Sequence, residues 1–548
     1  MMLAQTLVMT ETPAIAWSWF APELLVAAAA LHLLLLAVAG RRRAWVAVPV
    51  GIVGVTTGAF LVAADMLVPG VVALAAGAFS AASVFGFGLR PSLIGPWTAA
   101  VSLLGALVLT AWQYLDVMAG PGDTLQVGLA LEGALALDGI ALFTRLTVYG
   151  AALLTIPMGA GYLSDRGINR PEFEPLLLLS TVGMALLGAA SDLITLFVAL
   201  EILSIALYVL VSLARRDRRS QESGVKYFVM GAVASAILLY GMALLYVTTG
   251  SIELGIIADR IRLLAVPDQP AVLALALVTV GIGFKVALAP FQAWTPDVYQ
   301  GAPTNVTGFM AAATKAAGFA AVLRLYLLTF GGLSDLWVPI LAVLATASML
   351  YGALAALVQR DVKRILAYSS IAHAGYAAIG VASASNEGLS ATLWYLLTYA
   401  VTTITAFGAV LAIERRRRGE VALVDLRGLG RESPVLAGVF AVALLSLAGI
   451  PGTAGFVGKL QVFTAGVGAG LEWLVVVGVA SSVIAAFFYL RLMGLMFLEE
   501  PTAEPAEPLR LSDGLSLALA SGFALIVSLG VYPALVLDMA DRVAFVAR

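Results

Sequence analysis

Long apolar segments, separated by short polar ones, recur along the whole chain of 548 residues. A helix needs about 20 mainly apolar residues to cross the hydrocarbon core of a bilayer. The pattern therefore predicts an all-α polytopic membrane protein with about 14–16 transmembrane helices. We place sixteen at residues 20–40, 44–64, 71–89, 94–114, 138–160, 173–190, 192–213, 224–248, 271–293, 303–329, 337–358, 362–382, 389–413, 435–465, 473–497 and 512–536.

Two of these segments are interrupted in a similar way. The sequence LVTVGIGFKVALAPFQAWTPDVYQGAPTNVTGFMAAATKAAGF carries Lys285, breaks at Pro290, passes through a polar turn from Trp294 to Pro303, and carries Lys315 in its second apolar part. The sequence ALLSLAGIPGTAGFVGKLQVF breaks around Pro451 and then carries Lys459. Interrupted spans in corresponding places of two halves are typical of transporter ion sites.

From these breaks we expect two inverted five-helix repeats, each with one broken helix. The predicted parts of the chain are about four N-terminal helices in 1–137, one helix in 138–172, the first repeat in 173–330, the second in 331–497, and a linker with a C-terminal helix in 498–548. The offset of five spans between the repeats reverses their direction through the membrane, which is why we expect them to be inverted.

The placement of lysine suggests a chemistry. Only five lysines occur, and four of them, Lys226, Lys285, Lys315 and Lys459, fall within apolar segments, whereas Lys363 follows Arg360 in a basic loop. A charged side chain at bilayer depth costs about 2.5–3.5 kcal/mol, so one that is kept there is a candidate functional group. A buried lysine can release its proton, and an arginine cannot. The buried lysines are therefore candidate proton carriers.

Other polar residues follow helical spacing inside the spans. Glu201, Ser204 and Tyr208 share one face of a predicted helix, and so do Ser369, His373 and Tyr376. Hydroxyl groups alone are also compatible with hydrogen bonding between helices. Glu201 favours proton transfer, with a structural ion pair to a lysine as the alternative. For four other charged residues we expect an Asp138–Arg145 pair on one face, and Arg324 and Arg491 extending towards the membrane surface.

Composition excludes several classes of site. The chain is 61% hydrophobic and 12% charged, and it has no cysteine and only two histidines. Disulfides and iron–sulfur clusters are excluded, and a histidine-built metal or haem site is not favoured. The arginine-rich loops alternate with loops that carry few basic residues, which predicts that the basic loops are cytoplasmic and that both termini lie outside.

Several motifs resemble the antiporter-like membrane subunits of respiratory complex I, and within them subunit N of NADH-quinone oxidoreductase. The similar stretches cover most of residues 138–497, and WTPDVYQGAP is specific to subunit N. They are LFVALEILSIALYVLV, RDRRSQESGVKYF, GFKVALAPFQAWTPDVYQGAPTNVTGF, DVKRILAYSSIAHAGY and LSLAGIPGTAGFVGK. The resemblance implies about fourteen core helices with two inverted repeats, so that two N-terminal helices are additional. It also implies the membrane of a bacterium, and neighbouring membrane subunits of complex I as partners.

The resemblance implies a role for each candidate residue. Glu201 and Lys285 match the family's ion pair, Lys315 its central relay lysine, and Lys459 the lysine of the terminal half-channel. Lys226 and His373 would be secondary relay groups. No redox cofactor is expected in this chain; NADH, FMN, iron–sulfur clusters and quinone belong to partner subunits. Gln292 departs from the family, which often has histidine there.

We therefore expect a translocase subunit that couples quinone reduction in a neighbouring module to proton pumping. The alternatives are a cation/proton antiporter subunit, and a structural spacer in a related complex driven by ferredoxin or F420.

Overall fold

The computed structural model describes residues 17–39, 70, 91–118, 128–131, 133–168, 171–263, 268–417, 419–501 and 511–541. These residues fold almost entirely into helices, with one two-stranded antiparallel sheet. The first half of the elements is α1 (Trp17–Ala39), α4 (Pro91–Met118), β1 (Gly128–Ala130), β2 (Leu135–Leu137), α5 (Gly139–Asp165), α6 (Phe173–Ala189), α7 (Leu193–Val211), α8 (Arg218–Thr249), α9 (Leu254–Arg262), α10 (Gln269–Val286) and α11 (Thr295–Gly301). The second half is α12 (Thr304–Phe309), η2 (Met310–Thr314), α13 (Lys315–Leu323), η3 (Arg324–Thr329), η4 (Gly331–Leu333), α14 (Ser334–Leu357), α15 (Val362–Ala382), α16 (Asn386–Arg417), η5 (Leu423–Leu426), α17 (Leu429–Glu432), α18 (Pro434–Ala448), α19 (Ala454–Gly468), α20 (Glu472–Phe497), α21 (Asp513–Val531) and α22 (Ala534–Asp541).

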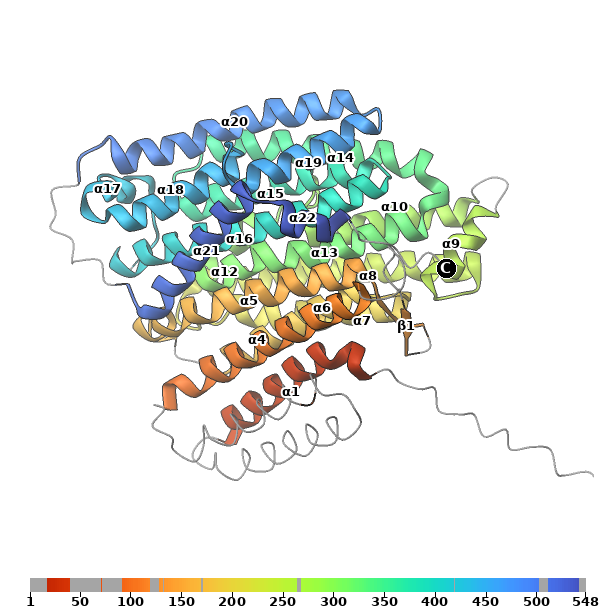
Figure 1. Ribbon diagram of the computed structural model, residues 1–548, viewed down its shortest axis with the longest axis horizontal. Helices are drawn as coiled ribbons and strands as arrows, with labels where there is room; N and C mark the ends of the chain where they lie inside the picture. The colour runs from red at the N-terminus through yellow and green to blue at the C-terminus, as the bar shows by residue number, and fades with distance from the viewer. Residues whose placement is uncertain are drawn as a thin grey trace, which may run out of the picture.

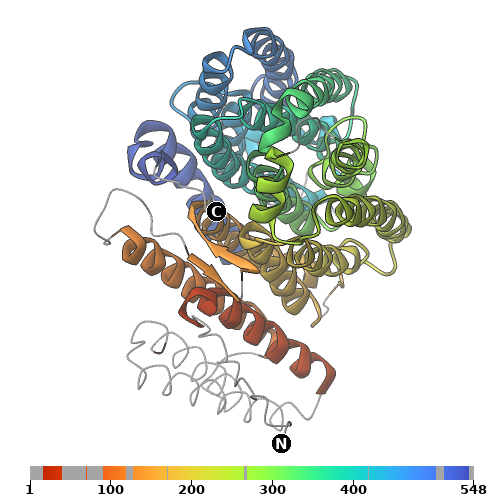
Figure 2. The ribbon, with the colours of Figure 1, turned by 90° about the vertical axis from the view of Figure 1, so that its right-hand side faces the viewer.

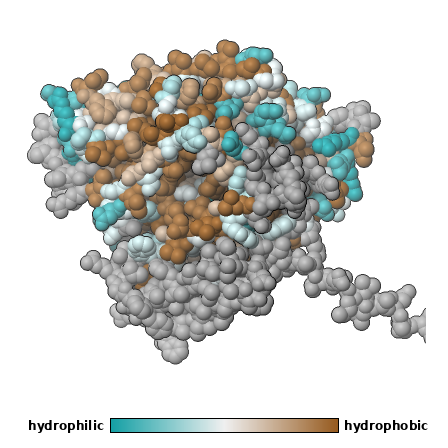
Figure 3. Space-filling view, viewed as in Figure 1, coloured by the Kyte–Doolittle hydropathy of each residue, from teal (hydrophilic) through white to brown (hydrophobic). Residues whose placement is uncertain are grey.

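The long helices run side by side as one bundle (Figure 1), and Figure 2 shows them nearly end-on. On the face seen in Figure 3, hydrophobic residues cover the middle of the bundle and hydrophilic residues gather towards its two ends. Twelve helices of the described part are long and apolar enough to cross a membrane, and α6 and α18 are shorter apolar helices. Fourteen of the predicted spans thus coincide with helices, whereas 44–64 and 71–89 lie outside the described residues.

Both interruptions occur where the sequence placed them. α10 ends at Val286 because Ala287 adopts a left-handed conformation with φ 60°, and Pro290 cannot donate a backbone hydrogen bond. α18 ends at Ala448, and Gly449 takes up the left-handed conformation with φ 84°. The segment from Trp294 to Pro303 is not the polar turn expected, because most of it forms α11. Each break leaves backbone carbonyls at the end of a helix without helical partners.

The span from Thr304 to Thr329 lies at the centre of the bundle, and nearly all of its residues are buried. It is an α-helix with two π-helical segments, η2 directly before Lys315 and η3 starting at Arg324. π-helical segments inside α-helices are often found at functional sites. Here they accompany the two buried cations of this span.

Two five-helix sets follow the same local plan. Asp192 caps α7 and forms an isolated β-bridge to Glu253, which follows the 32-residue helix α8. In the same way, Asp361 caps α15 and forms an isolated β-bridge to Ala422, which follows the 32-residue helix α16. The first bridge lies at the end of the bundle with β1 and α9, and the second near α17 at the other end (Figure 1). This opposite placement agrees with inverted repeats; the boundaries 173–330 and 331–497 stay predictions.

α1 and α4 form a side layer against α5 and α6 (Figure 2). A buried ion pair joins this layer to α5: Arg145 Nε donates to Glu23 at 2.6 Å, and Arg145 Nη1 donates to Gln113 at 3.0 Å. The predicted Asp138–Arg145 pair is therefore wrong. Asp138 instead accepts two hydrogen bonds from Arg324, at 2.8 and 3.0 Å.

Arg324 also donates to the Gly188 carbonyl at 2.8 Å and is 1% exposed, so it does not reach the membrane surface as the sequence suggested. Arg491, in contrast, is exposed as expected. Periodicity along one helix could not reveal that each of the two buried arginines finds its carboxylate on another helix.

Candidate functional site

Lys285 lies in the last turn of α10, directly before the first break. Lys285 is 5% exposed, and its amine donates a hydrogen bond to the Ser204 hydroxyl of α7 at 2.7 Å. The Tyr227 hydroxyl of α8 is 3.4 Å away, and the amine is 5.6 Å from the centre of that ring. Trp294 stacks on the Tyr227 ring and donates its indole N–H to the Phe284 carbonyl at 3.1 Å. The break thus places an amine among hydroxyl and aromatic groups.

Lys315 lies next to this break, on the central span. Lys315 is 3% exposed. Its amine donates hydrogen bonds to the Val286 carbonyl at 3.1 Å and to the Ser370 carbonyl of α15 at 2.6 Å. Val286 is the last residue of α10, so Lys315 binds one of the carbonyls that the break leaves without a helical partner. Two lysines therefore lie at the end of α10: Lys285 in the last turn of that helix and Lys315 on the central span.

Lys459 repeats this arrangement at the second break. Its amine donates to the Ala448 carbonyl, the last of α18, at 2.9 Å and to the Ser482 hydroxyl of α20 at 2.7 Å. It also lies 4.8 Å from the centre of the Tyr376 ring. In both halves a buried lysine thus binds the carbonyl that an interrupted helix exposes.

His373 connects the two lysine sites. Its Nδ1 lies 2.6 Å from the Tyr395 hydroxyl and its Nε2 lies 3.3 Å from the Tyr489 hydroxyl. It stands three residues after Ser370 on α15, and its ring meets that of Tyr376 edge to face at 5.5 Å. The charges of both Lys315 and Lys459 act on His373. Lys285, Lys315, His373 and Lys459 therefore form a buried line in which each residue is linked to the next through an intervening one: Val286, Ser370 or Tyr376.

Glu201 joins this line indirectly. Its carboxylate accepts a hydrogen bond from Ser235 at 2.6 Å, and Lys285 binds Ser204, one helical turn from Glu201. Glu201 still acts electrostatically on Lys285. The direct Glu201–Lys285 ion pair that the resemblance implied is not formed in this conformation. The Lys285 amine binds the Ser204 hydroxyl of α7 instead of the Glu201 carboxylate.

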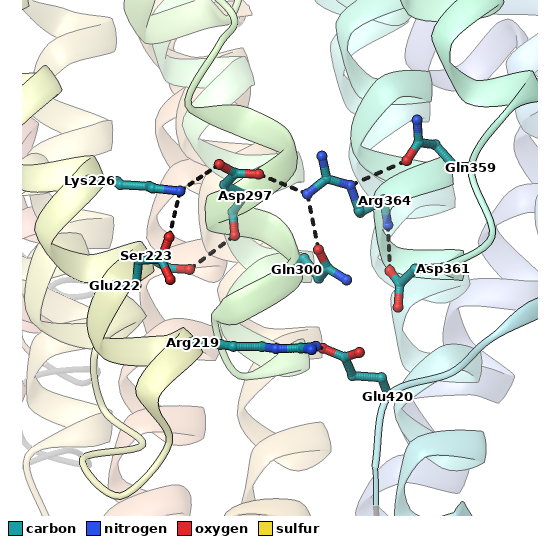
Figure 4. A network of polar contacts seen from close by, with 10 residues as sticks. All are labelled: Arg219, Glu222, Ser223, Lys226, Asp297, Gln300, Gln359, Asp361, Arg364 and Glu420. Carbon is teal, nitrogen blue, oxygen red and sulfur yellow. Dashed lines mark hydrogen bonds and ion pairs between the residues drawn. The ribbon is translucent and has the colours of Figure 1, made fainter.

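Lys226 lies apart from the buried line. It is half-exposed near the start of α8 and binds Glu222 at 2.7 Å and Asp297 at 2.8 Å. Asp297, on α11, also binds Arg364 of α15 at 2.8 Å, so that this carboxylate links α8 to α15 (Figure 4). Burial acts to raise the pKa of Asp297, but the hydrogen bonds and charges of Lys226 and Arg364 outweigh it and hold the pKa below its usual value.

Sequence reasoning missed two partners on α20. Ser482 binds Lys459, and Tyr489 binds His373 and lies close to the Ser369 hydroxyl. They stand seven residues apart, the same helical spacing that singled out the other polar stripes, so this signal was present in the sequence. Gln292 is buried, and its side-chain oxygen has no protein partner. Among the described residues no group of three or more histidine or acidic side chains is placed to hold a metal ion.

The chain is similar in sequence to a known family of membrane proteins. Residues 190–485 match the family model described as NADH:quinone oxidoreductase/Mrp antiporter, TM. NADH-quinone oxidoreductase subunit N of Parafrankia sp. (strain EAN1pec) is 44% identical over 438 residues, which are 75% of this chain and 83% of that protein. The chain belongs to the subunit N family of NADH-quinone oxidoreductase. The resemblance noted in the sequence is thereby confirmed.

Two further similarities support the family and its fold. Subunit N 2 of Roseiflexus castenholzii is 44% identical over 422 residues, 75% of this chain and 84% of that protein. A chain of respiratory complex I from Thermus thermophilus is 35% identical with a TM-score of 0.69, and the match covers 86% of this chain and 99% of that one. The predicted fold class, an all-α membrane protein of the antiporter-like kind, is also confirmed.

Proposed function

We propose that this chain is a proton-translocating membrane subunit of NADH-quinone oxidoreductase, with other membrane subunits of complex I as its partners. Quinone reduction takes place in a neighbouring module, which also holds the redox cofactors. The observation that carries the proposal is the buried line of titratable groups, Lys285, Lys315, His373 and Lys459, which ends at two interrupted helices. The basic loops face the cytoplasm of a bacterium, and both termini lie outside.

In this mechanism Glu201 controls the charge of Lys285. When Glu201 moves towards Lys285, the amine is stabilised as an ammonium ion, and when it moves away the amine releases its proton towards Lys315. Proton transfer then continues through His373, hydroxyl groups and water to Lys459. Moving one charge against 100 mV costs about 2.3 kcal/mol, which an ion-pair rearrangement in a low dielectric is able to supply. Lys226 and Asp297 supply charged groups at the end of the bundle that carries the basic loops.

The test is the pumping ratio of the assembled complex. Lys285→Ala and Glu201→Ala should each lower the number of protons pumped per electron in reconstituted vesicles, while the complex still assembles. Arg491→Ala, an exposed cation of α20, is the matched control and should leave the ratio unchanged. An undiminished ratio in both relay variants would rule out the relay.

A further inference from the structure

A second group of buried charges lies away from the line of lysines, at the basic end of the bundle, where α16 ends in three arginines. Glu414 is 3% exposed, and its carboxylate accepts hydrogen bonds from Arg166 at 2.8 Å, from the Tyr162 hydroxyl at 3.3 Å and from the Thr304 hydroxyl. Arg166, with 26% of its side chain exposed, connects this group to the protein surface. Both oxygens of the carboxylate thus accept hydrogen bonds.

Lys363 belongs to the same group. The sequence placed it in a basic loop, but it is the second residue of α15 and only 3% exposed. Its amine donates to the Ala302 carbonyl at 2.7 Å, and within the described part of the chain it makes no ion pair shorter than 4.0 Å. The charges that act on it are those of Glu414, Asp361, Asp217 and Arg166. An ammonium group has three donors, so at least one further partner is needed here.

Unpartnered polar atoms mark a route from this group towards Lys315. Both side-chain amide atoms of Asn305 are buried and have no partner in the protein, whereas the buried Thr403 and Ser370 hydroxyls form no close hydrogen bond but lie near tyrosine hydroxyl groups. Buried polar groups without a protein partner are normally satisfied by ordered water. The Tyr399 hydroxyl lies beside both Thr403 and Ser370. These atoms therefore mark places where water would bind.

The route follows two helix faces. On α15, Ser370 stands seven residues after Lys363, and its carbonyl binds the Lys315 amine. On α16, Thr403 stands eleven residues before Glu414 on the same face, with Phe407 between them, and the route must pass that apolar ring. α12, which carries Asn305, contacts both α16 and α5. The polar atoms thus extend from the basic end of the bundle to its central lysine.

We propose that Lys363, whose amine binds the Ala302 carbonyl two residues before the Glu414 partner Thr304, takes up protons from the basic end of the bundle and passes them through water bound at Asn305, Thr403 and Ser370 to Lys315. The neutral amine accepts a proton from hydronium, which leaves water, and the ammonium then gives that proton to the next water in the route. Glu414 is a positioning residue because both of its oxygens already accept hydrogen bonds from Arg166, Tyr162 and Thr304. The inference rests on the proposed function and adds the intake that the buried line of lysines lacks.

The test compares Lys363→Gln, Lys363→Arg and Lys315→Gln in the complete complex in vesicles. Glutamine keeps a donor for the Ala302 carbonyl, and arginine keeps the charge but cannot release a proton. Both Lys363 variants should lower the protons pumped per electron as far as Lys315→Gln does, with normal assembly and normal quinone reduction. Arg427→Gln is the control, because this half-exposed arginine pairs with Glu499 at the surface.

The outcomes separate the two proposals. If only Lys315→Gln lowers the ratio, the intake is overturned and the proposed function stands. If none of the variants lowers it, the proposed function fails and the intake with it. If Lys363→Gln lowers the ratio and Lys363→Arg does not, a fixed charge suffices, and proton uptake by Lys363 is overturned.

A second pair of variants covers the case in which the Lys363 variants do not assemble. Thr403→Val removes one of the proposed water positions, and the initial rate of proton pumping should fall. Thr181→Val is the matched control, because its buried hydroxyl already donates to the Leu177 carbonyl at 2.7 Å. Equal pumping rates in Thr403→Val and the wild type would overturn the route.

Discussion

At the scale of single residues, this protein buries charges in two ways. Arg145 and Arg324 each bind a carboxylate directly, and the exposed fractions of all four side chains are 4% or less. Lys285, Lys315 and Lys459 instead bind neutral hydroxyl and carbonyl groups. An arginine stays charged and therefore needs a permanent counter-charge, whereas a lysine held by neutral groups is able to lose its charge. The difference separates structural cations from candidate proton carriers.

The Glu23–Arg145 pair allows a direct test of the structural role. Arg145→Ala leaves Glu23 buried without its partner, which should destabilise the packing of α1 on α5 by about 3–5 kcal/mol. Replacing both residues, as in Glu23→Leu with Arg145→Met, should restore most of the loss because no charge remains buried. The measurement is the thermal midpoint of the purified complex in detergent. A double variant less stable than Arg145→Ala would contradict this account.

At the scale of elements, the interrupted helices organise the site. Both breaks were predicted from proline and glycine, which cannot continue a helix in the usual way. The sequence could not predict that the carbonyls they expose bind Lys315 and Lys459, because those contacts join different segments of the chain. The missed helix α11 has a related cause: its seven residues are too short for hydrophobic periodicity to reveal.

Gly449 tests the second break. An added Cβ would lie 2.8 Å from Lys459 Cδ, and the backbone there has φ 84°, which side-chain-bearing residues rarely adopt. Gly449→Ala should therefore cost about 1–3 kcal/mol and move Lys459 from the Ala448 carbonyl, which lowers the protons pumped per electron. In the same half, Gly468→Ala has open space around its Cβ and should change neither stability nor pumping. Equal behaviour of the two variants would show that the break does not position Lys459.

At the scale of the whole molecule, the bundle has two chemically different ends. α16 ends in Arg415, Arg416 and Arg417 at one of them, and the β-hairpin and α9 mark the other (Figure 1). The intake proposed at Lys363 lies at the arginine-rich end, which the positive-inside rule assigns to the cytoplasm. The buried line of lysines instead runs between the two interrupted helices, so the proposed uptake and the proposed relay lie in different parts of the bundle.

The orientation is open to direct labelling because the chain has no cysteine of its own. Val358→Cys, at a 76% exposed position before Arg360, should react with a membrane-impermeant maleimide only when the cytoplasmic face is accessible. Leu263→Cys, at an 83% exposed position after α9, should react only from the opposite face. Labelling of both after denaturation is the control for thiol reactivity. The reverse pattern would invert the proposed orientation and move the intake to the outside.

The sequence by itself determined the membrane class, the fourteen spans that coincide with described helices, both helix breaks and the buried lysines at them. These features follow from hydrophobicity, from proline and glycine, and from the cost of placing a charge in hydrocarbon, all of which are local properties. Only the tertiary structure decided which charges meet: Arg145 with Glu23, Arg324 with Asp138, and Lys363 within the bundle near Glu414. The partners lie on different helices, and their contacts depend on how those helices pack, which no periodicity along a single helix encodes.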